Sequence, residues 1–127
     1  MLDIKADENW GAYHCCLEGK HFNAAASRLY YSVFQAVYWW AQLIGKLDPK
    51  RDKTDVHSKV LLLVKDYCEK HPLSVNFAFR DLLKLRDLRR TADYDTDLLN
   101  RDDVVPLEGS AESIRIYFKK EAKNVRI

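Results

Sequence analysis

Apolar residues recur along this chain at intervals of three and four, which is the spacing of one face of an α-helix. Five segments carry this pattern, and no alternation of apolar and polar residues long enough for a strand competes with them. We therefore predict five helices and no sheet. The predicted helices cover residues 7–18, 22–44, 54–71, 76–91 and 111–124.

The expected helix ends follow from glycine and proline. Gly19 and Gly45 end the first and second helices, and the third begins with Thr54 or Asp55 as N-cap and stops before Pro72. The start of the last helix is open. It lies near Ala111, or at Asp103 with Pro106 in the first turn.

Each helix carries an apolar stripe that predicts its buried face. Short connections between long amphipathic helices indicate antiparallel neighbours. We expect an all-α fold, an antiparallel up-and-down four-helix bundle with an additional helix. The stripes are Trp10, His14 and Leu17; Phe22, Ala25, Ala26, Leu29, Val33, Val37, Trp40 and Ile44; Val60, Leu63, Val64 and Tyr67; Ala78, Leu82, Leu85, Leu88 and Ala92; and Ile114, Phe118 and Ala122.

Composition fits one domain over residues 1–127, since a chain of 127 residues with 47% hydrophobic content can bury a core without metals or disulfides. The net charge of +2 gives no global attraction to nucleic acid, so any affinity for phosphate must be local. The three cysteines and the absence of a signal-peptide pattern favour a cytoplasmic protein. The longest apolar run, 36–44, is shorter than the roughly 20 residues of a membrane span.

One arginine stands out on the fourth helix. Arg89 falls inside the apolar stripe, where a guanidinium must be paired or bound. Asp93 lies nearby on the same helix and could pair with Arg86 or with Arg89. The neighbouring cations, Arg80, Lys84 and Arg90, fit an ordinary solvated helix end.

The second helix carries an additional stripe opposite its core face. Large side chains with polar tips are typical of protein interfaces. We interpret this stripe as a homodimer seam, with coverage by another helix of the same chain as the alternative. Its members are Arg28, Tyr31, Gln35, Tyr38, Trp39 and Gln42.

No motif for a metal or an organic cofactor is present. The histidines lack metal-ligand spacing, the cysteines form no CxxC pair, and no phosphate-binding or dinucleotide fingerprint occurs. We therefore expect no metal and no cofactor. His57, in the first turn of the third helix, is the one histidine with a candidate role.

Three stretches together resemble the HEPN superfamily, in particular its small stand-alone prokaryotic members. They are GKHFNAAASRLYYSVFQAVYWW, KTDVHSKV and LRRTADYD, in that order, and the resemblance covers roughly residues 10–95. It implies a helical homodimer that works beside a minimal nucleotidyltransferase in a toxin–antitoxin or defence module. Many family members are metal-independent endoribonucleases with a composite site in the dimer.

The ribonuclease motif of that family is an arginine followed a few residues later by histidine. The arginine matches Arg89, but Tyr94 or Asp95 stands where the histidine would be. Cleavage through a 2′-hydroxyl needs a base and an acid near neutral pH, which imidazole supplies. Tyrosine, with a pKa of about 10, and aspartate, with one of about 4, would need large shifts.

The leading hypothesis is therefore a homodimer that binds a nucleotide, RNA or a nucleotidyltransferase partner without an established catalytic role. Its ligand site lies between the second and fourth helices. The first alternative is a ribonuclease in which Arg89, His57 or Tyr94 acts. The second is a non-catalytic assembly protein in which Arg89 and Asp93 form a buried salt bridge. The expected ligand-binding residues are Arg86, Arg89, Asp93, Tyr94 and Tyr31.

Overall fold

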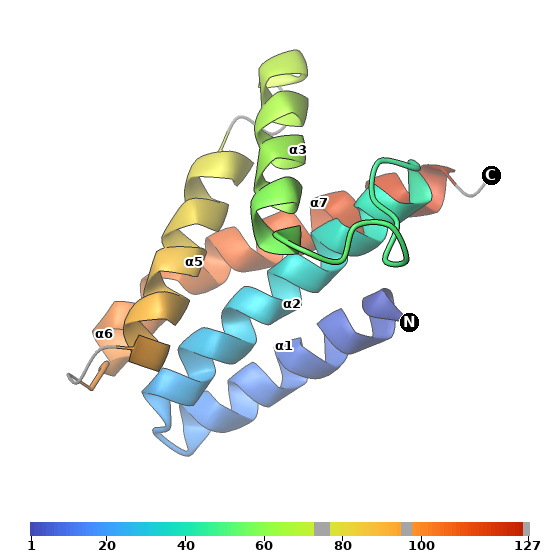
Figure 1. Cartoon of the computed structure of the whole chain (residues 1–127). Helices are drawn as coiled ribbons and strands as arrows, with labels where there is room; N and C mark the ends of the chain where they lie inside the picture. Colours follow the sequence, from blue (N-terminus) through green and yellow to red (C-terminus); the bar gives the residue numbers. More distant parts are fainter. Residues whose placement is uncertain (73–76, 95–97, 126–127) are drawn as a thin grey trace.

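The computed structural model describes residues 1–72, 77–94 and 98–125, and within these ranges it contains helices and no strand. The predicted all-α helical bundle is confirmed (Figure 1). Five long helices pack against one another. The elements are α1 (Leu2–Glu18), α2 (Phe22–Leu43), α3 (Val56–Lys70), α5 (Ala78–Tyr94), the short α6 (Arg101–Val104), the 3₁₀ turn η1 (Val105–Leu107) and α7 (Glu108–Val125).

Helix α2 is the central element of the bundle. It contacts α1, α3, α5 and α7, and α1 runs beside it in the opposite direction (Figure 1). Helix α3 begins against the middle of α2 and then rises away from it, with α5 descending beside α3 (Figure 1). This departs from the predicted antiparallel up-and-down arrangement in two respects. Helix α3 crosses α2 instead of lying along it, and α7 runs beside α2 in the same direction (Figure 1).

The core follows the predicted stripe of α2 closely, because this helix is covered on several sides. The stripe residues from Ala25 to Trp40 are buried, and only Phe22 and Ile44 at its two ends are half-buried. Ile114, Phe118 and Ala122 of α7 are buried as predicted.

The predicted inward residues of α1 require a correction. Ala6 and Tyr13 are the buried residues of α1, whereas Trp10, His14 and Leu17 are half-buried. Helix α1 covers the outside of α2, so it has only one narrow buried line. It also begins at Leu2, more than one turn before the predicted start. The predicted start of the fourth helix at Asn76 lies outside the described residues.

The ends of α1 and α2 share one hydrogen-bond pattern. At α2, Gly45 has φ +76°, the Gly45 N–H donates to the Gln42 carbonyl, and the Lys46 N–H donates to the Ala41 carbonyl. At α1 the left-handed residue is Lys20, one position after the expected Gly19. A Cβ at Gly19 would lie 2.9 Å from Cδ2 of the exposed His21 side chain, so that ring would have to move.

The last helix, α7, begins at Glu108, between the two predicted starts, and the short α6 and the η1 turn precede it. The Asn100 side chain accepts from the Asp103 N–H, and the Asp103 carboxylate accepts from the Asn100 N–H, which forms a capping box before α6. Pro106 lies in the η1 turn that joins α6 to α7, where its missing N–H leaves no helical bond unmade.

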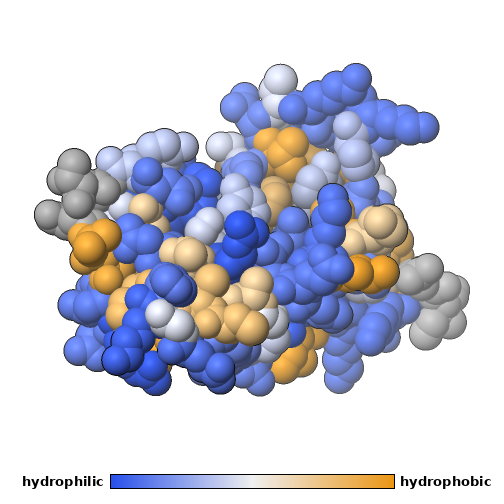
Figure 2. Space-filling view, turned by 90° about the horizontal axis from the view of Figure 1, so that it is seen from below, coloured by the Kyte–Doolittle hydropathy of each residue, from blue (hydrophilic) through white to orange (hydrophobic). Residues whose placement is uncertain are grey.

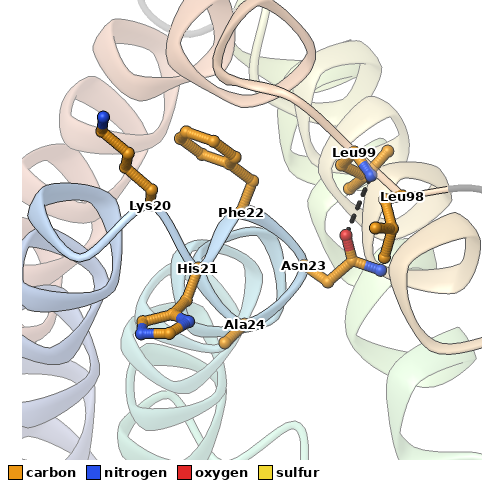
Figure 3. A pocket seen from close by; sticks show the side chains of 7 residues that line it. All are labelled: Lys20, His21, Phe22, Asn23, Ala24, Leu98 and Leu99. Atoms are coloured by element: carbon orange, nitrogen blue, oxygen red, sulfur yellow. Dashed lines mark hydrogen bonds between the residues drawn. The ribbon is translucent and has the colours of Figure 1, made fainter.

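Asn23 fastens three segments at one end of the bundle. Its Nδ2 donates to the Ala92 carbonyl at 3.0 Å, and its Oδ1 accepts from the Leu99 N–H at 2.9 Å. Figure 3 shows Asn23 beside Leu98 and Leu99 at the pocket that opens next to the start of α2. The amide thereby fixes the last turns of α5 relative to α2.

Helix α1 covers part of the additional stripe of α2. Arg28 Nη1 donates to Asn9 Oδ1 at 3.1 Å, and Asn9 Nδ2 donates to Gln35 Oε1 at 2.7 Å. Trp39 is buried, whereas Tyr38 and Gln42 stay half-buried. The alternative of coverage by the same chain therefore holds for one side of the stripe.

Candidate functional site

A cationic pocket lies where the beginning of α3 meets the last turns of α5. Its volume is about 460 Å³. Two short stretches of chain supply its lining, one on each side. The lining residues are Lys53, Asp55, Val56, His57, Ser58, Arg86, Arg89 and Arg90.

Arg89 is held at the back of this pocket by groups from α2 and α5. Its side chain is only 16% exposed, and Nη1 donates to the Tyr31 hydroxyl at 3.1 Å and lies 3.3 Å from Asp93 Oδ2. The guanidinium carbon also lies 5.4 Å from the ring centre of Tyr30. Arg89 thus has the hydroxyl and carboxylate partners that its position on the apolar face demands, and Asp93 pairs with Arg89, not with Arg86.

His57 lies against the same aromatic group. Its Nδ1 is 2.6 Å from the Tyr30 hydroxyl, and its ring stacks on Phe34 with 4.1 Å between ring centres. Burial raises the pKa of Tyr30 to about 12, so the phenol keeps its proton at neutral pH. The Tyr30 hydroxyl therefore bonds the imidazole as a neutral group.

The charge of His57 is set by its surroundings. Burial lowers the pKa of His57 below its usual value, and the positive charges of Arg89, Arg86 and Arg90 lower it further. At neutral pH the imidazole is therefore neutral and can accept a proton. Such a group in a pocket is a candidate for acid–base or ligand-sensing roles.

The beginning of α3 adds a further positive element. Asp55 is the N-cap residue, as predicted, but it has φ 53° and its side chain makes no capping hydrogen bond. The first-turn N–H groups of α3 are therefore not capped by Asp55, and the helix end adds a partial positive charge to the pocket.

The structure brings together most of the predicted site residues. Arg86, Arg89 and His57 line the pocket, and Tyr31 and Asp93 join it through Arg89. The predicted cleft between the second and fourth helices is corrected in one respect. The opening lies between α3 and α5, and α2 forms the wall behind it.

Tyr94 does not join this group. It is the last residue of α5, is 80% exposed and does not line the pocket. Its position gives no support to its expected binding or catalytic role. Asp95, the other residue at the motif position, lies outside the described residues.

Two lining cations were missing from the predicted site. Lys53 lies in the loop before α3, and Arg90 was assigned to a solvated helix end. The signal for Arg90 is its spacing of four from Arg86, which places both on one flank of α5. For Lys53 the sequence offers no comparable signal, because a loop conformation decides where it lies.

The described residues contain no group of three or more His, Cys, Asp or Glu side chains that could hold a metal ion. In the same part of the chain, no helix combines the length and apolar content needed to cross a bilayer.

Comparisons with protein-family models, curated proteins and solved structures found no match. The functional interpretation therefore depends on the geometry of the pocket and on the sequence resemblance described above.

We expect His57 to titrate below its ordinary value of about 6.5 in the free protein. Arg86→Gln should move the midpoint upward because one opposing charge is removed, and it can be followed by NMR of the imidazole protons. Lys84→Gln, on an exposed part of the same helix, is the matched control and should leave the midpoint unchanged.

The same shift gives a pH dependence of stability. Because the pKa of His57 is lowered in the folded protein, the unfolded chain binds more protons as the pH falls below about 6.5. The contribution of neutral His57 to the free energy of unfolding is therefore present above that pH and is lost as the pH falls through the native pKa. A midpoint at or above 6.5 would contradict the charge environment described for His57.

Proposed function

We propose that this chain is a HEPN-type homodimer that binds a nucleotide or RNA and works with a minimal nucleotidyltransferase in a toxin–antitoxin or defence module. The family, the module and the protein partner come from the sequence resemblance. The phosphate-bearing ligand is supported by one observation, the convergence of Lys53, Arg86, Arg89 and Arg90 on a single pocket. On a chain of net charge +2, this is a local concentration of cations.

The donors of this pocket suit a phosphate group. Arginine presents several N–H donors in one plane and binds phosphate oxygens in pairs. Arg86 makes no ion pair with any described residue, and its Nε is buried without a hydrogen-bond partner among them. No carboxylate of the described residues therefore neutralises its guanidinium.

A second candidate function is metal-independent RNA cleavage, and the position of His57 favours it. This chain lacks the motif histidine after Arg89, yet His57, on a different helix, lines the same pocket as that arginine. A neutral imidazole can take the proton of a 2′-hydroxyl while that oxygen bonds to phosphorus and the bond to the 5′-oxygen breaks, with water protonating the leaving oxygen. Arg89 can stabilise the negative charge that develops on the phosphate. This chemistry would use Nε2, in the tautomer whose Nδ1–H donates to the Tyr30 hydroxyl oxygen.

The non-catalytic alternative depends on the existing partners of Arg89. Tyr31 and Asp93 already satisfy part of its guanidinium, as in a structural salt bridge. This alternative explains Arg89 but not the convergence of Arg86 and Arg90 on the same space.

The proposed homodimer would use the half-buried part of the α2 stripe. Tyr38 and Gln42 line a hollow of about 500 Å³ together with Met1, Leu43 and the buried Trp39. Figure 2, which views the molecule from below Figure 1, shows small apolar patches separated by hydrophilic atoms. Mixed surfaces of this kind are typical of interfaces between folded subunits.

For ligand binding, we expect a short single-stranded RNA to bind with an affinity that falls steeply with salt, measured by fluorescence anisotropy. Arg86→Gln should weaken binding roughly tenfold and reduce the salt dependence, because a charge-assisted contact is lost. Arg89→Lys should not retain full affinity, since an ammonium lacks the planar donors. Lys84→Gln is the control, and equal weakening by that variant would argue against the pocket.

For catalysis, we expect the purified chain to cleave no RNA measurably without a partner, because the motif histidine is absent after Arg89. Should cleavage occur, it should persist with a chelator and be lost in His57→Ala. Cleavage lost with Arg89→Ala but kept in His57→Ala would identify a different base and contradict the role given to His57.

For assembly, light scattering at tens of micromolar, roughly the range in which a standard-size interface holds, should show a dimer. Tyr38→Glu should give a monomer because it places a charge in the proposed seam. Leu62→Glu, at an exposed apolar residue of α3, is the matched control and should leave the dimer intact. A monomeric parent protein would refute the dimer.

A further inference from the structure

The charges around the pocket are not balanced by the protein itself. Four cationic side chains line it, and two carboxylates oppose them, Asp55 in the lining and Asp93 on Arg89. Two positive charges remain uncompensated, and the end of α3 adds to them. The best-matched ligand therefore carries about two negative charges at one point.

We propose that the pocket selects a phosphate monoester, either a free mononucleotide or the phosphorylated end of an RNA strand, over the internal phosphodiesters of RNA. This inference rests on the proposed function and names the ligand group within it. A monoester carries close to two charges at neutral pH, since its second pKa is about 6. An internal diester carries only one.

The arrangement of donors supports the same choice. The cations approach one space from two sides, with Lys53 before α3 and with Arg86 and Arg90 one turn apart on α5. A terminal phosphate offers three oxygens to donors on different sides, whereas an internal phosphate has only two non-bridging oxygens and must leave room for chain on both sides. Of the aromatic group only His57 lines this space, and Phe34, on which it stacks, and Tyr30, which bonds it, lie behind it.

His57 provides a local reporter of occupancy. The groups that face it are Tyr30, Tyr31 and Phe34 from α2, Arg86, Arg89 and Arg90 from α5, and Lys53, Asp55 and Ser58 from its own segment. The guanidiniums oppose protonation of the imidazole in the free protein. A dianion among them would offset that repulsion, so binding should be coupled to proton uptake.

The test compares two RNA oligomers of identical sequence, one with a 5′-phosphate and one with a 5′-hydroxyl, by calorimetry with the full chain. A nucleoside monophosphate and its nucleoside form a second pair, which separates a free nucleotide from an RNA end. We expect the phosphorylated member of at least one pair to bind about tenfold more tightly or better. Inorganic phosphate should raise the NMR titration midpoint of His57.

Two single variants test whether the arginines of the pocket cause the preference for the phosphorylated ligand. Arg86→Gln and, separately, the exposed Arg90→Gln should bring the preference close to unity, whereas Lys84→Gln should keep it. Using two variants guards against a folding defect in either one, and circular dichroism checks each.

The outcomes distinguish this inference from the proposed function. Equal binding of both oligomers, with no preference in the nucleotide pair, would overturn the monoester selection and leave RNA binding standing. No binding by any ligand would overturn both. A phosphate preference that survives both arginine variants would also overturn the inference, because the selecting group would then lie elsewhere.

Discussion

The half-buried guanidinium of Arg89 is the group on which the site depends. A charge with so little exposure to water needs partners, and α2 supplies two of them, the Tyr31 hydroxyl and the Tyr30 ring. Tyr30 in turn bonds His57, so one cluster joins α2, α3 and α5. The loss of Arg89 would therefore disturb both the pocket and the place where α3 leaves the bundle.

The cluster packs against α2, the central helix of the fold. Helices α1 and α7 contact α2, while α3 begins at its middle and turns away, so that the first turn of α3 and the end of α5 face a common space. Asn23, at the start of α2, holds the end of α5 in place, because its side chain donates to the Ala92 carbonyl. The position of Arg89 relative to α2 is thus set by contacts on both sides of the pocket.

Helical periodicity predicted the part of this site that lies within single helices. The position of Arg89 on an apolar stripe follows from its spacing to Leu82 and Leu85, and the all-α bundle follows from the same rule. The proximity of His57 to Arg89 does not follow from helical periodicity, because it depends on the path of the 44–55 loop and on the direction of α3. The start of α6 could have been predicted from Asn100 and Asp103, since a capping box is a local signal, but Pro106 three residues later obscured it.

The three arginines of α5 differ in the partners that the protein gives them. Arg89 has a hydroxyl and a carboxylate partner at Nη1, while its Nε is buried without a hydrogen-bond partner among the described residues. Arg86 and Arg90 have no ion pair with any described residue, yet they stand beside Arg89 and against a neutral imidazole. Like charges placed this close repel one another, and their approach costs free energy unless an opposite charge offsets it. The arginines of the free pocket therefore repel one another, and a bound anion offsets that repulsion. The offset is greatest for the ligand that concentrates the most negative charge on the fewest atoms.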